Sequence, residues 1–234
     1  MQRRSLLVVA LVLSVAFAGC TGGSTAPTTT QTEGDATTVV PSGADGGNDG
    51  GGSGSGDTSS LDAGQWNLLS FDRPTRFTYD LYTADEGTGT LVWDVTKVEG
   101  DQVTLHLIYD LGDVHYETTT TGAAGTVNSQ LFSNPAGALL LTSMVSPASA
   151  YAGRDLHVGL QWSYSSPDGS ASYAVTGTDS YAGVECFTSE MRHNGSVVRE
   201  DCLNPNLGLA PYTVYYDADG TVVMKMELVG YETH

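Results

Sequence analysis

The chain has 234 residues, with 27 Asp and Glu against nine Lys and Arg, which gives a formal net charge of −18. Phosphate backbones and anionic lipid headgroups repel such a surface, so the charge argues against nucleic acid or an anionic membrane surface as a direct partner. In dilute buffer the same charge destabilises a compact domain. At molar salt, where the Debye length is about 3 Å, that penalty nearly vanishes.

The carboxylates are scattered along the whole chain, and only two lysines occur, Lys97 and Lys225. This acidic, lysine-poor composition resembles that of proteins from halophilic archaea. The alternative is an acidic protein that binds cations, but the carboxylates show no ligand-like spacing. We therefore expect an extreme halophile as the source.

The first residues form an export signal. Arg3 and Arg4 precede an apolar run from Leu6 to Phe17, and small residues then lead to Cys20. A basic start, a short apolar core and a small-residue cleavage site are typical of a secretory signal. The run is too short to cross a hydrocarbon layer of about 30 Å as a mature helix.

The cysteine at the cleavage site resembles a lipobox, which implies that residues 1–19 are removed as a lipoprotein signal peptide and that Cys20 carries a lipid. Arg3 and Arg4 also resemble the twin-arginine export motif. We expect a protein anchored by this lipid on the extracellular face of the cell membrane. The alternative is an ordinary signal peptide with an unrelated cysteine.

Residues 20–60 consist mainly of Thr, Gly, Ser, Asp and Pro. Such a segment buries too little apolar surface to offset the entropy lost on ordering, so we expect a disordered, lipid-anchored linker. Its Thr-rich part is a candidate for O-linked sugars, and a plain tether is the alternative. The linker would hold the next domain at a distance from the membrane.

Residues 61–234 are expected to form one domain with an apolar period of two, which is typical of strands. Gly- and Asp-rich turns separate the runs and indicate antiparallel neighbours. We predict an all-β fold, an antiparallel curved sheet or half-barrel of about eleven strands. The expected strands lie near 75–83, 90–98, 102–110, 114–121, 126–132, 156–165, 171–178, 183–192, 197–203, 211–217 and 221–231.

One segment breaks the strand pattern. Asn134 and Pro135 supply a capping residue and a first-turn proline before an apolar run that ends before Pro147. We predict a short helix over 135–146 that buries Leu139, Leu140 and Met144. Because the segment is apolar nearly all round, we expect it to lie on the concave side of the sheet.

Between the expected strands the chain carries, in this order, Asn134-Pro135 and the segments 159–162 (GLQW), 181–186 (YAGVEC) and 220–223 (GTVV). This order resembles a family of uncharacterised prokaryotic envelope proteins, similar to the lipoprotein-carrier and mycobacterial lipid-carrier half-barrels. The resemblance implies that an apolar ligand binds in a groove, and it contributes no catalytic residue.

Cys186 and Cys202 form an even pair in an exported chain, which favours a disulfide over a metal or redox pair. A three-residue loop at 193–195 would place the two cysteines directly opposite each other, whereas a two-residue turn would miss that register by one. Asn194 opens an N-x-S sequon on the same hairpin tip and is a candidate glycosylation site. The alternative is that Asn194 serves the turn alone.

Other patterns point to turns and surface positions. The segment 217–220 (DADG) imitates the start of a calcium loop, but Leu228 stands where the bidentate Glu should be, so we expect a hairpin turn. His106 and His115 could meet across a hairpin near Gly112. No nucleophile, phosphate-loop or metal motif is present, so we expect no catalytic residue, no cofactor and no metal.

The sequence therefore predicts a binding protein rather than an enzyme. Our first hypothesis is a half-barrel groove that holds a lipid or an acylated partner. The alternative is a structural or protein-interaction module of the envelope with a solid core. The candidate groove residues are Leu139, Leu140, Met144, Trp93 and Trp162.

Overall fold

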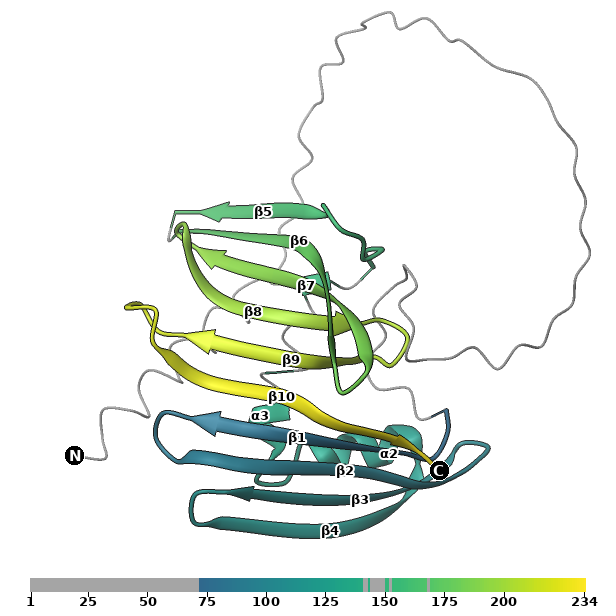
Figure 1. Cartoon of the computed structure of the whole chain (residues 1–234). Coiled ribbons are helices and arrows are strands. Elements are labelled where there is room, and N and C mark those ends of the chain that lie inside the picture. The colour runs from purple at the N-terminus through teal and green to yellow at the C-terminus, as the bar shows by residue number, and fades with distance from the viewer. Residues whose placement is uncertain (1–71, 141–142, 144–149, 152, 168) are drawn as a thin grey trace, which may run out of the picture. The chain divides into compact units, whose positions relative to one another are not determined.

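A computed structural model describes residues 72–140, 143, 150–151, 153–167 and 169–234. Its strands form one antiparallel sheet in the order β4-β3-β2-β1-β10-β9-β8-β7-β6-β5 (Figure 1). Neighbouring strands follow one another in the chain, except that β1 in the centre pairs with the last strand, β10. This pairing joins the first and last strands of the domain.

In β1 and β3 buried residues alternate with more exposed ones, as expected where one face of a sheet is covered. The bounds of the strands are β1 Thr75–Thr83, β2 Gly87–Glu99, β3 Gln102–Leu111, β4 Val114–Ala123, β5 Gln161–Ser166, β6 Gly169–Tyr181, β7 Val184–His193, β8 Ser196–Asn204, β9 Leu209–Tyr216 and β10 Val222–Thr233.

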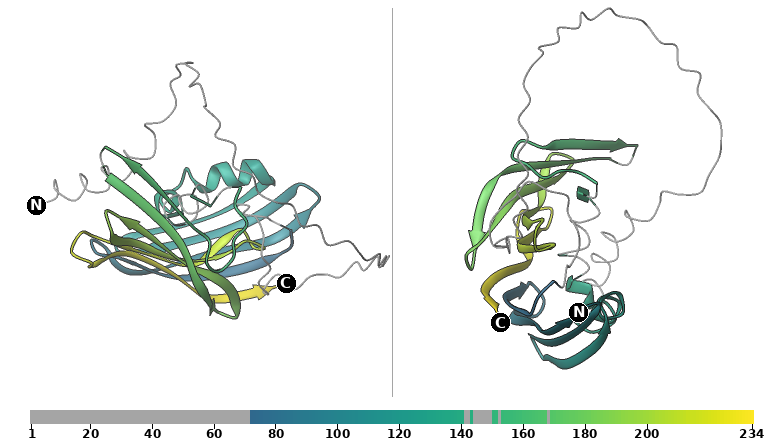
Figure 2. Two further views of the ribbon diagram at one scale, coloured as in Figure 1. Left: turned by 90° about the horizontal axis from the view of Figure 1, so that it is seen from above. Right: turned by 90° about the vertical axis from the view of Figure 1, so that its right-hand side faces the viewer.

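The sheet is curved, and two short helices lie on one face of its β1–β4 part (Figure 2). These helices are α2 (Ala124–Leu131) and α3 (Gly137–Leu140). The strand expected at 126–132 is therefore wrong, because most of that segment belongs to α2. Val127 and Leu131 are both buried, and their spacing of four places them on one side of a helix.

The start of α3 is fixed by the residues that the sequence indicated. The Oδ1 atom of Asn134 accepts a hydrogen bond from the backbone N–H of Ala136 at 2.9 Å. Gly137 follows where no side chain fits, since a Cβ there would lie 2.3 Å from the carbonyl oxygen of Phe132. The rest of the helix expected over 135–146, including Met144, lies outside the described residues apart from Ser143.

Two cores cover the concave face. The first lies under α2 and α3 and contains Leu91, Trp93, Leu105 and Leu107. The second lies at the other end of the sheet, where Tyr151 and Leu156 from the segment before β5 are buried with side chains of β6 to β9. The predicted all-β, curved antiparallel fold is confirmed, with ten strands instead of about eleven. The signal peptide, the linker and the expected domain boundary lie outside the described residues.

Candidate functional site

A pocket of about 240 Å³ opens between α2 and the strands β3 and β4. Its lining combines apolar residues with uncharged polar ones, and no charged side chain lines it. The lining residues are Leu105, Leu107, Tyr116, Thr118, Thr120, Val127, Gln130, Leu131, Ser133 and Asn134.

The pairing of β3 with β4 explains this mixture. Thr118 is directly opposite Leu107, and Thr120 is directly opposite Leu105, so both threonines share the helix-covered face with the two leucines. Thr119 alternates to the other face, where it is exposed and opposite His106. The pocket therefore has leucines of β3 at its floor and a polar wall on the edge strand β4, and most of its exposed surface is polar. It can take an uncharged chain, because nothing in it would pair with a charged group.

The structure distributes the predicted groove residues over both cores. Leu139, Leu140 and Trp93 belong to the first core, with 7%, 1% and 2% of their surfaces exposed. They lie near the pocket but do not line it. Met144 lies outside the described residues.

Trp162 packs at the far end of the sheet. Its ring stacks on Tyr173 of β6 with centroids 4.9 Å apart, and the edge of Tyr151 meets it at 4.8 Å. The guanidinium of Arg154 lies over the indole, 4.4 Å from its centroid. Trp162 is thus enclosed by three side chains, and the structure does not bring it together with Trp93.

A buried ion pair that sequence reasoning missed lies beside the second core. Arg199 and Asp201 are two residues apart on β8, and the Nε atom of Arg199 donates to Oδ2 of Asp201 at 2.7 Å. Thr213, opposite Asp201 on β9, donates to its Oδ1 at 3.1 Å. Burial raises the pKa of Asp201, and the guanidinium and the Thr213 hydroxyl oppose that rise. The pair is enclosed, so it is a structural centre and not an accessible site.

A signal for this pair is present in the sequence. Residues two apart on a strand share a face, so Arg199 and Asp201 must both point toward the same side of the sheet. That side also receives Leu203, which is fully buried. A charged pair in phase with a buried leucine indicates a buried ion pair.

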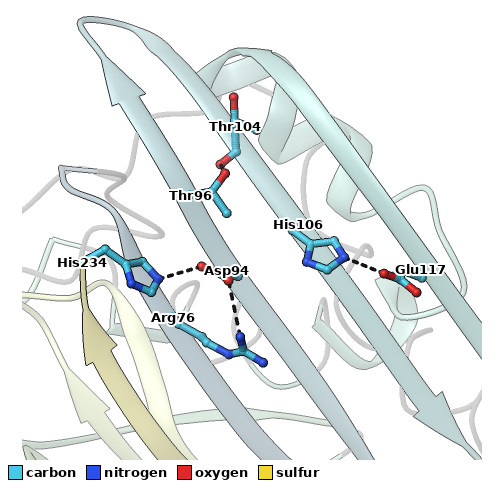
Figure 3. Close-up of polar contacts among 7 residues, drawn as sticks. All are labelled: Arg76, Asp94, Thr96, Thr104, His106, Glu117 and His234. Carbon is cyan, nitrogen blue, oxygen red and sulfur yellow. Dashed lines mark hydrogen bonds and ion pairs between the residues drawn. The ribbon is translucent and has the colours of Figure 1, made fainter.

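The opposite face of β1–β4 carries a row of polar side chains (Figure 3). Arg76, Asp94 and His106 are direct neighbours across β1, β2 and β3. Asp94 is bracketed by the guanidinium of Arg76 at 3.7 Å and the Nε2 atom of His234 at 3.1 Å. His106 turns away from it and contacts Glu117 through Nε2 at 2.9 Å. Each acidic group therefore has a cationic or imidazole neighbour.

His106 and His115, which could have met across the β3–β4 hairpin, instead both lie beside Glu117. His106 lies 2.9 Å from Oε1 of Glu117, and His115 lies 4.0 Å from its Oε2. The Nδ1 atom of His115 is 2.5 Å from Oδ1 of Asp110, directly opposite it on β3. The hydrogen bond to Asp110 raises the pKa of His115, and the charges of Asp110 and Glu117 add to the rise. Within the described part of the chain, no group of three or more His, Cys, Asp or Glu side chains could hold a metal ion.

The predicted disulfide between Cys186 and Cys202 is confirmed, with Cα atoms 5.3 Å apart. Of the two turns considered for this hairpin, the structure has the two-residue turn, so the cysteines are not directly opposite each other. The turn has two residues, Asn194 and Gly195, with positive φ angles of 50° and 87°, and His193 pairs with Ser196. A bulge then shifts the pairing, so Cys202 is opposite Thr188 and reaches Cys186 diagonally across the two strands.

The two other turn motifs behave as turns. Oδ1 of Asp217 accepts the backbone N–H groups of Asp219 and Thr221, both at 2.9 Å, so the calcium-like segment is a hairpin turn as predicted. At the other tip, Oδ1 of Asn194 accepts the N–H of Ser170 at 2.9 Å. The side chain of Asn194 is therefore engaged with the next hairpin, and its glycosylation stays a prediction.

None of the helices in the described part of the chain is long and apolar enough to cross a membrane. The sequence matches no family model. No curated protein matches it either.

Among solved structures, the chain is similar to MucB, with a TM-score of 0.41 and 12% identity over 69% of this chain and 54% of that one. It is also similar to the MucA/MucB complex of Pseudomonas aeruginosa, with a TM-score of 0.40 and 14% identity over 69% and 52%. A candidate lipoprotein from Parabacteroides distasonis gives 0.32 and 13% over 74% and 100%. The chain thus spans about half the length of the MucB chains that it matches. Similarity of this degree carries no conclusion about ligand or partner.

Proposed function

We propose that this chain is a lipid-anchored binding protein of the cell surface that holds an apolar chain, from a lipid or an acylated partner, on the concave face of its sheet. The observation that carries the proposal is the pocket between α2 and β3–β4, with leucines at its floor and an uncharged polar wall. The anchor rests on Cys20 and the export signal on Arg3 and Arg4. Binding without catalysis fits a lining that offers no charged or nucleophilic pair.

The size of the pocket limits the ligand. Sites that enclose a whole drug-sized molecule have volumes of roughly 300–1,000 Å³. A pocket of about 240 Å³ is smaller, so it would take one acyl chain or one apolar side chain and leave the remainder of the ligand outside. The polar wall on β4 would then face the boundary between the inserted chain and water.

The test uses two threonines that are neighbours in sequence and on opposite faces. Thr118→Trp places an indole in the pocket, while Thr119→Trp places it on the exposed face of the same strand. With a short-chain neutral monoacylglycerol as the uncharged apolar probe, titrated by calorimetry, we expect saturable binding to the parent and to Thr119→Trp, and a loss of at least tenfold in affinity for Thr118→Trp. Equal binding by both variants, or none by the parent, would overturn the proposal.

A solid-core envelope module is the second candidate, and one observation favours it. Leu139, Leu140 and Trp93, which were expected to border a groove, are almost completely buried. A parent protein that binds no monoacylglycerol would support this candidate.

The anchor is tested separately. Cys20→Ser should move the protein from the membrane fraction to the medium of its native host or leave it unprocessed. Unchanged fractionation would remove the lipid from the proposal and would leave the pocket untouched.

A further inference from the structure

The strand β5 ends the sheet and leaves one edge of its backbone open. Its residues Gln161–Ser166 pair with β6 in continuous register from Gln161–Ala174 to Ser166–Gly169. Among the residues that the structure describes, none pairs with the outer edge of β5. An edge of this kind presents a row of backbone donors and acceptors that can pair with another strand.

The strand itself lacks several of the features that usually prevent such pairing, although the guanidinium of Arg154 lies beside it over Trp162. Natural edge strands are protected by charges, prolines or bulges. β5 contains no charged residue and no proline, and its pairing shows no register shift. The edge at the other end of the sheet differs, since β4 carries His115 and Glu117 in ion pairs.

The absence of charge on β5 is unusual in so acidic a chain. Residues 156–167 contain no Asp, Glu, Lys or Arg, in a protein whose net charge is −18. Two copies of so acidic a chain repel each other least where their surfaces are uncharged. The β5 edge is therefore a place where a second copy can approach at the lowest electrostatic cost.

We infer that β5 pairs antiparallel with β5 of a second copy about a two-fold axis, which joins two ten-stranded sheets into one. Tyr164 supports this occupant. It lies in the middle of the strand with 67% of its surface exposed, which is the highest value among the exposed large apolar and aromatic side chains of the described residues. A side chain of this size at an open edge gains most from a partner strand, where aromatic cross-strand pairs contribute stability.

The register follows from two constraints. The concave faces of the two copies lie on the same side of the joined sheet, so residues that pair across the new contact must point to the same face. The two-fold axis therefore passes through a residue, either Ser163 or Tyr164. An axis at Ser163 would set Tyr164 of one copy against the indole of Trp162 in the other. Tyr173 stacks on one face of that indole, so the guanidinium of Arg154, 4.4 Å from the ring centroid, covers the outward face. The axis therefore lies at Tyr164, which meets its own counterpart.

The first experiment measures the oligomeric state by sedimentation velocity in molar KCl, from about 10 μM to about 1 mM of the full chain carrying Cys20→Ser. A single pair of short strands forms a small interface, so we expect a concentration-dependent dimer. Tyr164→Lys places two like charges at the axis and should shift the midpoint of dimerisation at least tenfold upward. Val229→Lys, at an exposed apolar position on β10, should leave it unchanged.

The second experiment traps the register. Directly paired Cα atoms are about 4.5–5.5 Å apart, within the range for a disulfide. On mild oxidation, Tyr164→Cys should therefore give a cross-linked dimer much faster than Val229→Cys. A monomeric parent at all concentrations, polymers in place of dimers, or equal cross-linking rates would overturn the inference. A Tyr164→Lys protein that still dimerises like the parent would overturn it as well.

Discussion

The two ends of the sheet bury different kinds of side chain. Under α2 and α3 the core consists of aliphatic and aromatic side chains without a charged group, with Leu91, Leu105 and Leu107 almost completely enclosed. At the other end the apolar core is smaller, and the ion pair of Arg199 with Asp201 lies beside it. A substitution in an apolar core lowers stability in proportion to the buried surface or volume that it changes. A substitution of one partner of a buried ion pair lowers stability more, because it leaves the other charge buried without a counter-charge. The two ends should therefore respond very differently to single substitutions.

The largest effect is expected at Asp201. Asp201→Leu leaves the Arg199 guanidinium buried without its counter-charge, which should lower the free energy of unfolding by about 3–5 kcal/mol. Glu190→Leu is the matched control, because Glu190 and Arg192 form an ion pair with the same spacing on β7 but are partly exposed. Its cost should stay within about 1 kcal/mol. Urea denaturation in molar KCl measures both.

A double variant separates the ion pair from its geometry. Arg199→Met combined with Asp201→Leu removes both charges and should recover most of the stability lost in Asp201→Leu, since an apolar pair of similar size fills the same space. If the double variant is as unstable as the single one, the loss comes from packing and the contrast between the two ends disappears.

The second prediction concerns the disulfide, which joins β7 to β8 next to the smaller core. Replacing both Cys186 and Cys202 by Ala opens a loop with a sequence separation of 16 and should lower stability by about 3 kcal/mol. Reducing the parent should give the same loss in urea denaturation. A double variant as stable as the oxidised parent would show that the small core does not need the bond.

The third prediction addresses the apolar end. Leu140 is 1% exposed, so Leu140→Trp should overpack the first core and cost about 1–3 kcal/mol. Val114→Trp, at an exposed position on β4, should change stability by less than about 0.5 kcal/mol. Equal effects in urea denaturation would mean that space remains beside Leu140, as the original groove hypothesis requires.

Much of the fold could be predicted because its information is local. Alternation on β3, where Val103, Leu105 and Leu107 point to one face, is visible without any tertiary contact. The helix α2 was missed because its sequence is rich in Gly, Thr, Ser and Asn, which are poor helix formers. Only the spacing of Val127 and Leu131 indicated it. The pairing of β1 with β10 joins residues from opposite ends of the domain, and no local pattern specifies it.

The candidate site was less accessible to sequence reasoning. The disulfide was predicted correctly, but the bulge that sets its register depends on how β7 and β8 pack in the sheet. The pocket depends on the register of β3 against β4, which decides that Thr118 and not Thr119 faces α2. Within the run of four threonines nothing distinguishes the two faces, and only the alternation of Glu117 with Tyr116 before it indicates the phase.

The smallest expected effect is at the exposed face behind the apolar core, where His115 contacts Asp110. The hydrogen bond and charge of Asp110 raise the pKa of His115 above its usual value. A histidine whose pKa is raised on folding contributes stability that is complete below the unfolded pKa, about 6.5, and that is lost as the pH rises through the folded pKa. NMR titration of the His115 ring should therefore give a pKa above the ordinary histidine value of about 6.5. Asp110→Asn should lower the His115 value toward it. If Asp110→Asn leaves the titration of His115 unchanged, the contact between the two side chains is not maintained in solution. The exposed face of β3 and β4 would then add nothing to the stability of this end of the sheet.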